Sequence, residues 1–289
     1  MEEQYKMAVD TRILFTDLDG TLLNDSKEVT PGNQAAIDEA LEKGHKIVIC
    51  TGRPLASAKG CAQKAGLDKK GCYVICFNGG QIYDPYDKKT IYGKTFSRET
   101  SVKIIEAALE WKIHIQSYSD THILSARDTE ELHKYAQINR LPYEIVENAA
   151  AVVPEEPYKL IAITSAEEKD KNIRFQKEVI SQYAGEVHSF FSNDCYQEIV
   201  SEGISKGFAV RWLCEYLGIP IENSVAAGDA QNDVEMLKAA HVGAVMCNAF
   251  PGIAEYGNYV TENDNNHDGV AEIIHRFILK DTVNGVSSN

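Results

Sequence analysis

Short apolar runs alternate with stretches of helical periodicity in the first quarter of the chain. Apolar residues dominate the runs Arg12–Thr16, Lys46–Cys50 and Cys72–Phe77, which are typical of buried strands. Thr30–Gly44 spaces its apolar residues as a helix does, with an expected N-cap at its first residue, a proline next and a glycine at its end. A second helix is expected near Leu55–Ala65. Strand and helix therefore alternate, which predicts a parallel sheet covered by helices.

The same alternation returns near the C-terminus. Helices are expected at Lys206–Leu217 and Asp233–Ala240, and strands at Ser224–Ala227 and Val242–Met246. These elements extend the same parallel sheet, so the two ends of the chain are expected to form one α/β domain.

Polar-faced helices distinguish the middle of the chain, at Glu99–Trp111, Thr129–Asn139 and Glu167–Tyr183. Strands with alternating apolar and polar positions are expected among them, including His114–Tyr118, Lys159–Thr164 and His188–Ser192. We interpret residues 85–194 as a second α/β domain inserted into the first, which then consists of residues 1–84 and 195–289.

The formal net charge of the 289-residue chain is −14, which argues against a general basic surface for nucleic acid or an anionic membrane. No apolar run approaches the roughly 18 residues that cross a bilayer. The first residues, MEEQYKMAVDTR, lack the basic and apolar regions of a secretory signal. Seven cysteines without a CxxC pair are typical of reduced thiols. We therefore expect a cytoplasmic protein with no nucleic-acid or membrane partner.

Two aspartates follow the first apolar run, in the segment FTDLDGTLL. Asp17 comes directly after the run, at the carboxyl end of a predicted parallel strand, where open α/β sheets bind ligands. A carboxylate there can attack phosphorus and form an aspartyl-phosphate. Asp19 can then protonate the leaving oxygen and later activate water. The pattern DxD alone leaves open a plain aspartate-rich turn.

Two further segments carry candidates for binding an anion. Thr51, Gly52 and Arg53 follow the strand Lys46–Cys50, and a hydroxyl with backbone N–H groups can hold phosphate oxygens. Lys206 begins a predicted helix, and its ammonium group can neutralise a carboxylate and a bound phosphate. A TGR tripeptide is otherwise a common turn, and a single lysine is otherwise solvated surface. The position of the TGR turn at the end of a predicted parallel strand is what favours a phosphate-binding role for it.

A third segment, AAGDAQND, adds Asp229 and Asp233 after another apolar run. Together with Asp17 and Asp19 they make four carboxylates, which would oppose one another's ionisation unless a cation lay between them. Carboxylate oxygens are the ligands that Mg²⁺ prefers, and a dication also screens an anionic nucleophile from an anionic phosphate. We therefore expect Mg²⁺ as the cofactor, although GDxxND is also found as an aspartate-capped turn.

In their order along the chain, DLDGTLL, TGR, SKG and GDAQND resemble the four motifs of the haloacid dehalogenase superfamily. FNGG after the third strand and NDNNHDGVA near the end resemble its Cof-type sugar-phosphatase branch. The resemblance runs from about Ile13 to Leu279. It implies an α/β fold with a Rossmann-like parallel-sheet core and a large inserted α/β cap that covers the site and selects the substrate.

The resemblance also implies roles for the charged residues of these motifs. Asp17 matches the nucleophile and a metal ligand. Asp19 matches the acid/base residue and gives the metal its backbone carbonyl. Lys206 matches the lysine that steadies phosphate and nucleophile, and Asp229 matches the metal-binding carboxylate. Asp233 matches a carboxylate that orients metal-bound water or Lys206.

The remaining candidates concern the substrate. Thr51 and Gly52 match the phosphate-binding positions of the family, and Asn232 is expected near the phosphate. Possible contacts with the rest of the substrate are Asn78, Arg53 and Glu198.

Together these features favour a Mg²⁺-dependent phosphatase that hydrolyses a small phosphorylated metabolite, such as a sugar phosphate, as a monomer or homodimer. A phosphomutase acting on a hexose phosphate remains an alternative, since the motifs do not separate it. A non-catalytic sensor of a phosphorylated ligand is less favoured, because Asp17 and Asp19 are both present. Dehalogenation is also less favoured, since that chemistry needs neither Asp19 nor Mg²⁺.

Overall fold

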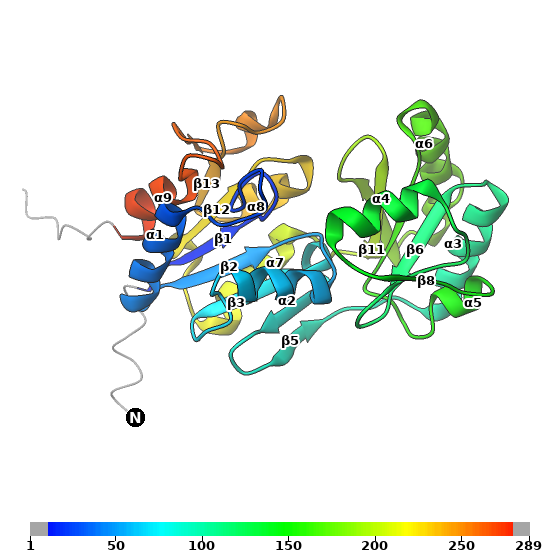
Figure 1. The fold of residues 1–289 in the computed structure, drawn as a ribbon, viewed down its shortest axis with the longest axis horizontal. Helices are drawn as coiled ribbons and strands as arrows, with labels where there is room; N and C mark the ends of the chain where they lie inside the picture. Colours follow the sequence, from blue (N-terminus) through cyan, green and yellow to red (C-terminus); the bar gives the residue numbers. More distant parts are fainter. Residues whose placement is uncertain (1–10, 280–289) are drawn as a thin grey trace, which may run out of the picture.

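Two β-sheets organise residues 11–279, which the computed structural model describes (Figure 1). Eight strands form the first sheet in the order β14-β13-β12-β1-β2-β3-β4-β5, and six form the second in the order β10-β11-β9-β6-β7-β8. Residues 1–10 and 280–289 of the expected core domain lie outside the described part of the chain. Within residues 11–279, the helices are too short or too polar to cross a membrane.

The first sheet is parallel from β14 to β3, as the sequence predicts, and ends in an antiparallel β4–β5 hairpin. Its strands are β1 Ile13–Thr16, β2 Lys46–Cys50, β3 Cys72–Cys76, β4 Gln81–Asp84, β5 Lys89–Gly93, β12 Ser224–Gly228, β13 Val242–Val245 and β14 Tyr259–Val260. Its α-helices are α1 Pro31–Glu42, α2 Leu55–Lys64, α7 Lys206–Leu217, α8 Val234–Ala239 and α9 Gly269–Ile273.

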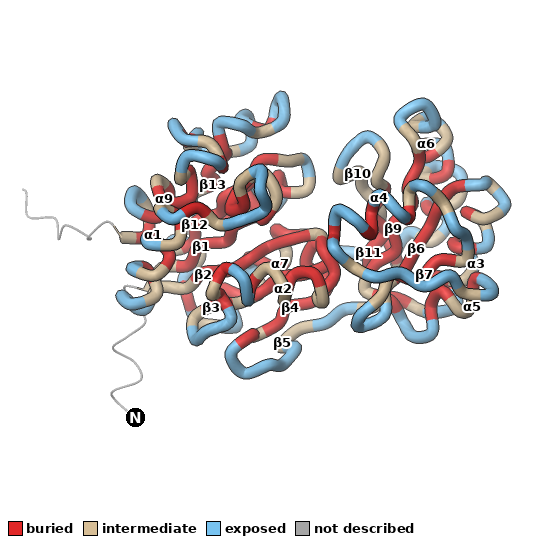
Figure 2. The backbone as a smooth tube through the Cα atoms, viewed as in Figure 1, coloured by how far each residue is buried: buried red, intermediate tan, exposed pale blue. Residues whose placement is uncertain are grey.

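Helices cover both faces of the first sheet, because successive residues of a strand point to opposite sides. On β1, Leu14 packs in the cluster that contains α1, α2 and α9, whereas Ile13 and Phe15 pack with α7 and α8. All four residues of β1 are buried (Figure 2). This two-sided burial explains why the strands are continuous apolar runs.

The second sheet has a well-packed face and a partly covered one. Its strands are β6 His114–Tyr118, β7 Ile123–Ser125, β8 Tyr143–Ile145, β9 Lys159–Ile163, β10 Val187–Phe191 and β11 Tyr196–Ser201. The helices α3 Arg98–Glu110, α5 Ala149–Val152 and α6 Lys169–Glu178 form one hydrophobic cluster with it, and α4 Glu130–Asn139 forms a smaller one. Short 3-10 helices lie at Phe77–Gly79, Ala166–Glu168, Ile180–Tyr183, Ile221–Asn223, Gln231–Asp233 and Ile253–Tyr256, and a π-helix at Ile274–Ile278.

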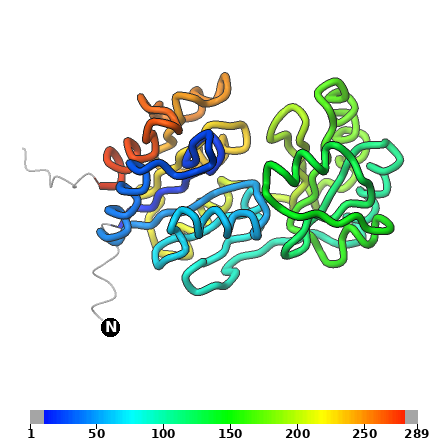
Figure 3. The backbone as a smooth tube through the Cα atoms, viewed as in Figure 1, coloured from blue at the N-terminus to red at the C-terminus, as the bar shows by residue number. Residues whose placement is uncertain are grey.

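The chain leaves the first sheet after Gly93 and returns after Ser201 (Figure 3). These crossings differ from the expected limits at 85 and 194. The reason is strand pairing: β5 forms a hairpin with β4, and β11 pairs antiparallel with both β10 and β9. We call residues 94–201 the inserted unit and the remaining described residues the core unit.

A carboxylate from far along the chain holds the first turn of α1. Thr30 occupies the N-cap position, as expected, but its side chain makes no capping bond. Its hydroxyl donates to Asp268 Oδ1 at 2.5 Å, and the same oxygen accepts the backbone N–H of Asn33 at 3.2 Å. Gly32 makes this approach possible, since a β-carbon there would lie 2.4 Å from the Asp268 carboxyl carbon. Asp268 therefore provides the cap that Thr30 does not.

Replacing Asp268 by alanine should lower the free energy of unfolding by about 1–2 kcal/mol, the usual cost of a lost helix cap. Urea denaturation of the two proteins measures the difference. Asp120→Ala removes an exposed carboxylate elsewhere and should change stability by less than about 0.5 kcal/mol. Equal stability of Asp268→Ala and the unchanged protein would contradict the capping role.

Candidate active site

Three functional segments leave the first sheet at one edge, because β2, β1 and β12 are adjacent and parallel. Thr16, the last residue of β1, is paired with Ala227 of β12. Asp17 follows directly, and its backbone N–H donates to the Ala227 carbonyl at 3.0 Å. Asp229 follows β12, and Thr51 follows β2. The sheet topology thus brings together three residues that are far apart in sequence.

A buried lysine connects this edge to α7. Lys206, the first residue of α7, donates from Nζ to Asp17 Oδ1 at 2.5 Å and to Asp233 Oδ1 at 2.6 Å. The side chains of Lys206 and Asp233 are 0% exposed, and that of Asp17 is 10% exposed. Ser205 fixes the start of the helix, because its hydroxyl accepts the Phe208 backbone N–H at 3.0 Å. Lys206 is therefore held against both carboxylates by the fold itself.

Both carboxylate oxygens of Asp233 are engaged within the protein. Oδ1 binds Lys206, and Oδ2 accepts the backbone N–H groups of Asp229 and Ala230, each at 3.0 Å. Asp233 therefore orients the lysine and the turn that carries Asp229.

Burial and crowding shift the pKa values of this cluster. Burial raises the pKa of Asp17 well above its usual value, opposed by Lys206 and assisted by Asp233 and Asp229. Burial, and after it Asp233, raises the pKa of Asp229 to about 6. Burial lowers the pKa of Lys206, but Asp17 and Asp233 outweigh it and the pKa is raised. One ammonium group thus faces three carboxylates, so the cluster favours the binding of a proton or of a further cation.

The donor set of the cluster fits a divalent cation. Asp17, Asp229 and Asp233 each offer an oxygen within 4.8 Å of the others. Among residues 11–279, Oδ2 of Asp17 and Oδ2 of Asp229 receive no hydrogen bond, while Asp229 Oδ1 accepts the Thr21 hydroxyl at 2.9 Å. Gly20 keeps the space open, since a β-carbon there would lie 2.6 Å from Asp229 Oδ2. Such hard oxygen donors would suit a cation of the Mg²⁺ or Ca²⁺ class, for which Asp17 and Asp229 are the candidate ligands.

Asp19 has different partners. Its carboxylate accepts Arg53 Nε and Nη2, both at 2.8 Å, and Lys27 Nζ at 2.7 Å. Burial raises the pKa of Asp19, but Arg53 and Lys27 outweigh it, so the pKa is lowered. From the sequence, Arg53 is expected as a possible substrate contact. In the structure its guanidinium group is hydrogen-bonded to Asp19. An acid/base role for Asp19 therefore requires that it exchange one of these bonds for a substrate oxygen.

Hydrogen-bond donors for an oxyanion surround the turn after β2. The Arg53 backbone N–H donates to Thr51 Oγ1 at 3.2 Å, which leaves the hydroxyl proton free to donate elsewhere. Asn78 lies against Gly52: a β-carbon added at position 52 would come within 3.0 Å of the Asn78 amide oxygen. That oxygen accepts Asn232 Nδ2 at 3.3 Å, while Asn78 Nδ2 is buried without an acceptor among the described residues. An unsatisfied buried donor of this kind fits a phosphate oxygen.

Glu198 reaches this region through another residue. It lies on β11 of the inserted unit and pairs with Lys159 Nζ at 2.7 Å. Lys159 in turn donates to the Gly52 carbonyl at 2.7 Å. Neither Lys159 nor Lys27 was predictable from the sequence, because a lone lysine lies in no pattern that reveals its partner.

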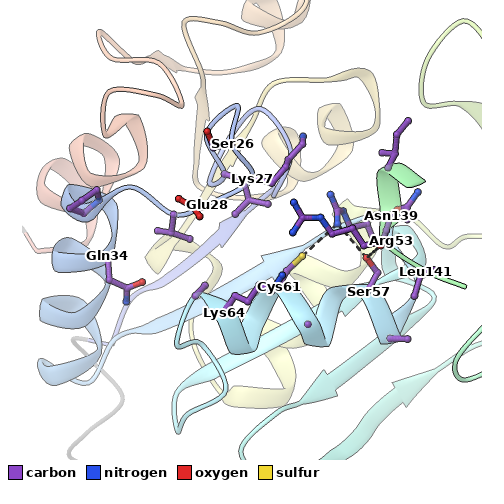
Figure 4. A pocket seen from close by; sticks show the side chains of 18 residues that line it. Ser26, Lys27, Glu28, Gln34, Arg53, Ser57, Cys61, Lys64, Asn139 and Leu141 are labelled. Atoms are coloured by element: carbon purple, nitrogen blue, oxygen red, sulfur yellow. Dashed lines mark hydrogen bonds between the residues drawn. The ribbon is translucent and has the colours of Figure 1, made fainter. Parts of the chain in front are cut away.

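A cavity of about 720 Å³ lies beside Lys27 and Arg53 (Figure 4). Lys27 and Arg53, the two partners of Asp19, line it, as do residues of α2 and the C-terminal end of α4. Figure 4 shows Asn139 from the inserted unit above Ser57 of α2, whose hydroxyl donates to the Asn139 carbonyl at 2.9 Å. Both units therefore line the cavity, which has room for a small molecule next to the two cations that bind Asp19.

Known proteins resemble the chain over nearly its whole length. The sequence model of the haloacid dehalogenase-like hydrolases matches residues 14–274. "Putative phosphatase YxeH" of Bacillus subtilis (strain 168) is 30% identical over 274 residues, which are 93% of this chain and 98% of that protein. The 5-amino-6-(5-phospho-D-ribitylamino)uracil phosphatase YcsE of the same bacterium is 30% identical over 94% of this chain and 97% of its own. A crystal structure of a haloacid dehalogenase-like hydrolase from Bacteroides thetaiotaomicron has a TM-score of 0.83 at 27% identity, covering 92% of this chain and 99% of that one.

Asp229→Asn should stabilise the metal-free protein by about 1–2 kcal/mol at pH 7.5, because it removes a crowded carboxylate and keeps an acceptor for Thr21. The gain should shrink toward pH 4: ionisation of Asp229 costs stability as pH rises from its ordinary pKa of 3.8 to its folded-state pKa of about 6, and the cost is constant above that. Added MgCl₂ should stabilise the unchanged protein and leave the variant unaffected.

Urea denaturation with a chelator, and then with MgCl₂, measures both effects. Asp120→Asn, an exposed carboxylate outside the cluster, is the control and should respond to Mg²⁺ like the unchanged protein. A metal-free Asp229→Asn protein that is less stable than the unchanged protein would contradict the crowding argument.

Proposed function

The chain belongs to the haloacid dehalogenase-like hydrolase family, and on this premise we propose that it is a phosphoric monoester hydrolase with Asp17 as its nucleophile. The buried contact of Lys206 with Asp17 and Asp233 carries this proposal. Lys206 holds the Asp17 carboxylate at the end of β1, beside the hydrogen-bond donors of the Thr51 turn. Its positive charge also reduces the repulsion between this carboxylate and an anionic substrate.

The residues around the turn after β2 supply the phosphate site. The Thr51 hydroxyl, the Gly52 backbone N–H and the Asn78 amide are the proposed donors, and Lys206 adds positive charge. Asn232 donates a hydrogen bond to the amide oxygen of Asn78, so the N–H groups of the Asn78 amide remain to face the phosphate. Preorganised donors of this kind stabilise the charge that develops in phosphoryl transfer.

Hydrolysis then takes two steps. An Asp17 oxygen attacks phosphorus as the bond to the substrate alcohol breaks, and Asp19 donates a proton to the departing oxygen. Water next attacks the aspartyl-phosphate and gives its proton to Asp19, which releases inorganic phosphate and restores Asp17. A divalent cation, for which we propose Mg²⁺, would be held by Asp17, Asp229 and the Asp19 backbone carbonyl and would stabilise phosphoryl charge.

The inserted unit is the proposed cap over this site. Ser57–Asn139 and Gly52–Lys159 are hydrogen-bonded pairs that join the two units beside the Thr51 turn. A lid excludes water and selects the leaving group. The relative YcsE is named for a substrate whose phosphate is borne on a ribityl chain, which supports a small sugar-like phosphate ester as substrate.

The cysteines bear on the compartment in which the protein works. All seven cysteines are free thiols, which supports a reducing compartment such as the cytoplasm. We propose a small soluble phosphate ester as the only substrate partner, and a monomer or homodimer as the working form.

Asp17→Asn should lower kcat by at least about 10³-fold, because an amide cannot form the aspartyl-phosphate. Phosphate release from p-nitrophenyl phosphate and a panel of sugar phosphates, with MgCl₂ present, measures this. Thermal denaturation of the variant confirms that it is folded. The unchanged protein should lose activity with a chelator and regain it with MgCl₂.

Retained turnover by folded Asp17→Asn would remove the proposed nucleophile, and absence of hydrolysis across the whole panel would remove the proposed function. Formation of an isomeric hexose phosphate without free phosphate would instead indicate a mutase.

A further inference from the structure

The carbonyl of Gly52 connects the anion-binding turn Thr51–Arg53 to the inserted unit. The other two carbonyls of the turn are bonded within the core unit, each at 3.1 Å, to the backbone N–H groups of Asn78 and Phe77. The Gly52 carbonyl instead accepts Lys159 Nζ of β9 at 2.7 Å. One of the three peptide groups that shape the turn therefore has its partner in the other unit.

Lys159 is prepared for this contact by its own unit. The residue is 1% exposed, and its ammonium group pairs with Glu198 of β11 at 2.7 Å. Ser192 donates to the other oxygen of Glu198 at 2.9 Å, and the ring of Tyr118 lies 5.4 Å from Lys159 Nζ. These contacts fix the position of the buried ammonium group. Its hydrogen bond to the Gly52 carbonyl is therefore part of the ordered structure.

The contact between Lys159 and Gly52 constrains the groups that donate hydrogen bonds to a bound phosphate. The Gly52 carbonyl and the Arg53 N–H belong to one rigid, planar peptide group. That N–H donates to Thr51 Oγ1 at 3.2 Å and so directs the hydroxyl proton away from the turn. Fixing the carbonyl therefore also fixes the donor that orients the Thr51 hydroxyl.

We propose that Lys159 is a positioning residue that completes the phosphate-binding turn only while the inserted unit rests on the core unit. The inference rests on the proposed function for the identity of the turn's ligand. When the units separate, the Gly52 carbonyl loses its buried partner and the peptide is free to rotate. Phosphate binding and closure then favour each other, because each stabilises the same form of the turn.

Lys159→Met tests this, since it keeps an extended apolar side chain and removes the donor. The dissociation constant for inorganic phosphate, measured by titration calorimetry with MgCl₂ present, should rise about 10-fold. In turnover of p-nitrophenyl phosphate, KM should rise by a similar factor while kcat changes by less than about 3-fold, because Lys159 does not touch the reacting atoms.

Two further variants keep the test decisive. Lys159→Met with Glu198→Gln removes both buried charges, so that no unpaired carboxylate destabilises the fold. It should show the same weakened phosphate binding. Tyr158→Leu removes the stacking of Tyr158 on Phe77, with ring centres 5.4 Å apart, which is a contact between the units that does not involve Gly52. Its phosphate affinity should stay within about 2-fold of the unchanged protein.

A folded double variant that binds phosphate as the unchanged protein does would overturn the inference. Equal weakening by Tyr158→Leu would overturn it as well, since unit contact in general would then be responsible. Lack of phosphate binding by the unchanged protein would also overturn it. The binding measurement needs no turnover, so a failure of the proposed hydrolysis is distinguished from a failure of this inference.

Discussion

The buried ammonium group of Lys206, held between Asp17 and Asp233, is the contact on which the site depends. It joins the end of β1, the start of α7 and the turn after β12, and Asp17 lies 189 residues from Lys206 in the chain. Removing one partner of a buried ion pair typically costs about 3–5 kcal/mol, because the other charge is left without compensation. The same contact places the proposed nucleophile, Asp17, so the residues that stabilise the fold here are also those proposed for the chemistry.

An acidic chain that acts on an anionic ester needs positive charge at specific positions. The described residues provide it as side chains that are each tied to a carboxylate: Lys206 to Asp17, Arg53 to Asp19 and Lys159 to Glu198. These pairs keep the cations ordered near the site, where low solvent access makes their field effective. The remaining excess of carboxylates around Asp17 and Asp229 fits the proposed divalent cation.

The inserted unit has hydrophobic cores of its own, separate from those of the core unit. Contacts between the units near the site include single hydrogen bonds such as Ser57 to Asn139 and Lys159 to Gly52. Aromatic contacts of Tyr118 and Tyr158 with Phe77 add to these bonds, while the buried residues of each cluster come from one unit. This separation suits a lid, because it can move or change its lining residues without disturbing the sheet that carries Asp17.

Much of the site was predictable from local pattern. Apolar periodicity is set by neighbouring residues, so it located β1, β2 and β12 and with them Asp17, Thr51 and Asp229 at their ends. The order of parallel strands then put these residues at one edge of the sheet. The resemblance of the motifs pointed to Lys206 and Asp233 as well.

Other features were decided only by the tertiary structure. Strand pairing placed β5 in the first sheet and β11 in the second, because hydrogen-bonding partners distant in sequence leave no periodic mark on either strand. The partners of Asp19 and Gly52, which are Arg53, Lys27 and Lys159, were decided in the same way. A lysine or arginine side chain is attracted to any carboxylate or carbonyl oxygen, and the tertiary fold determines which one it meets.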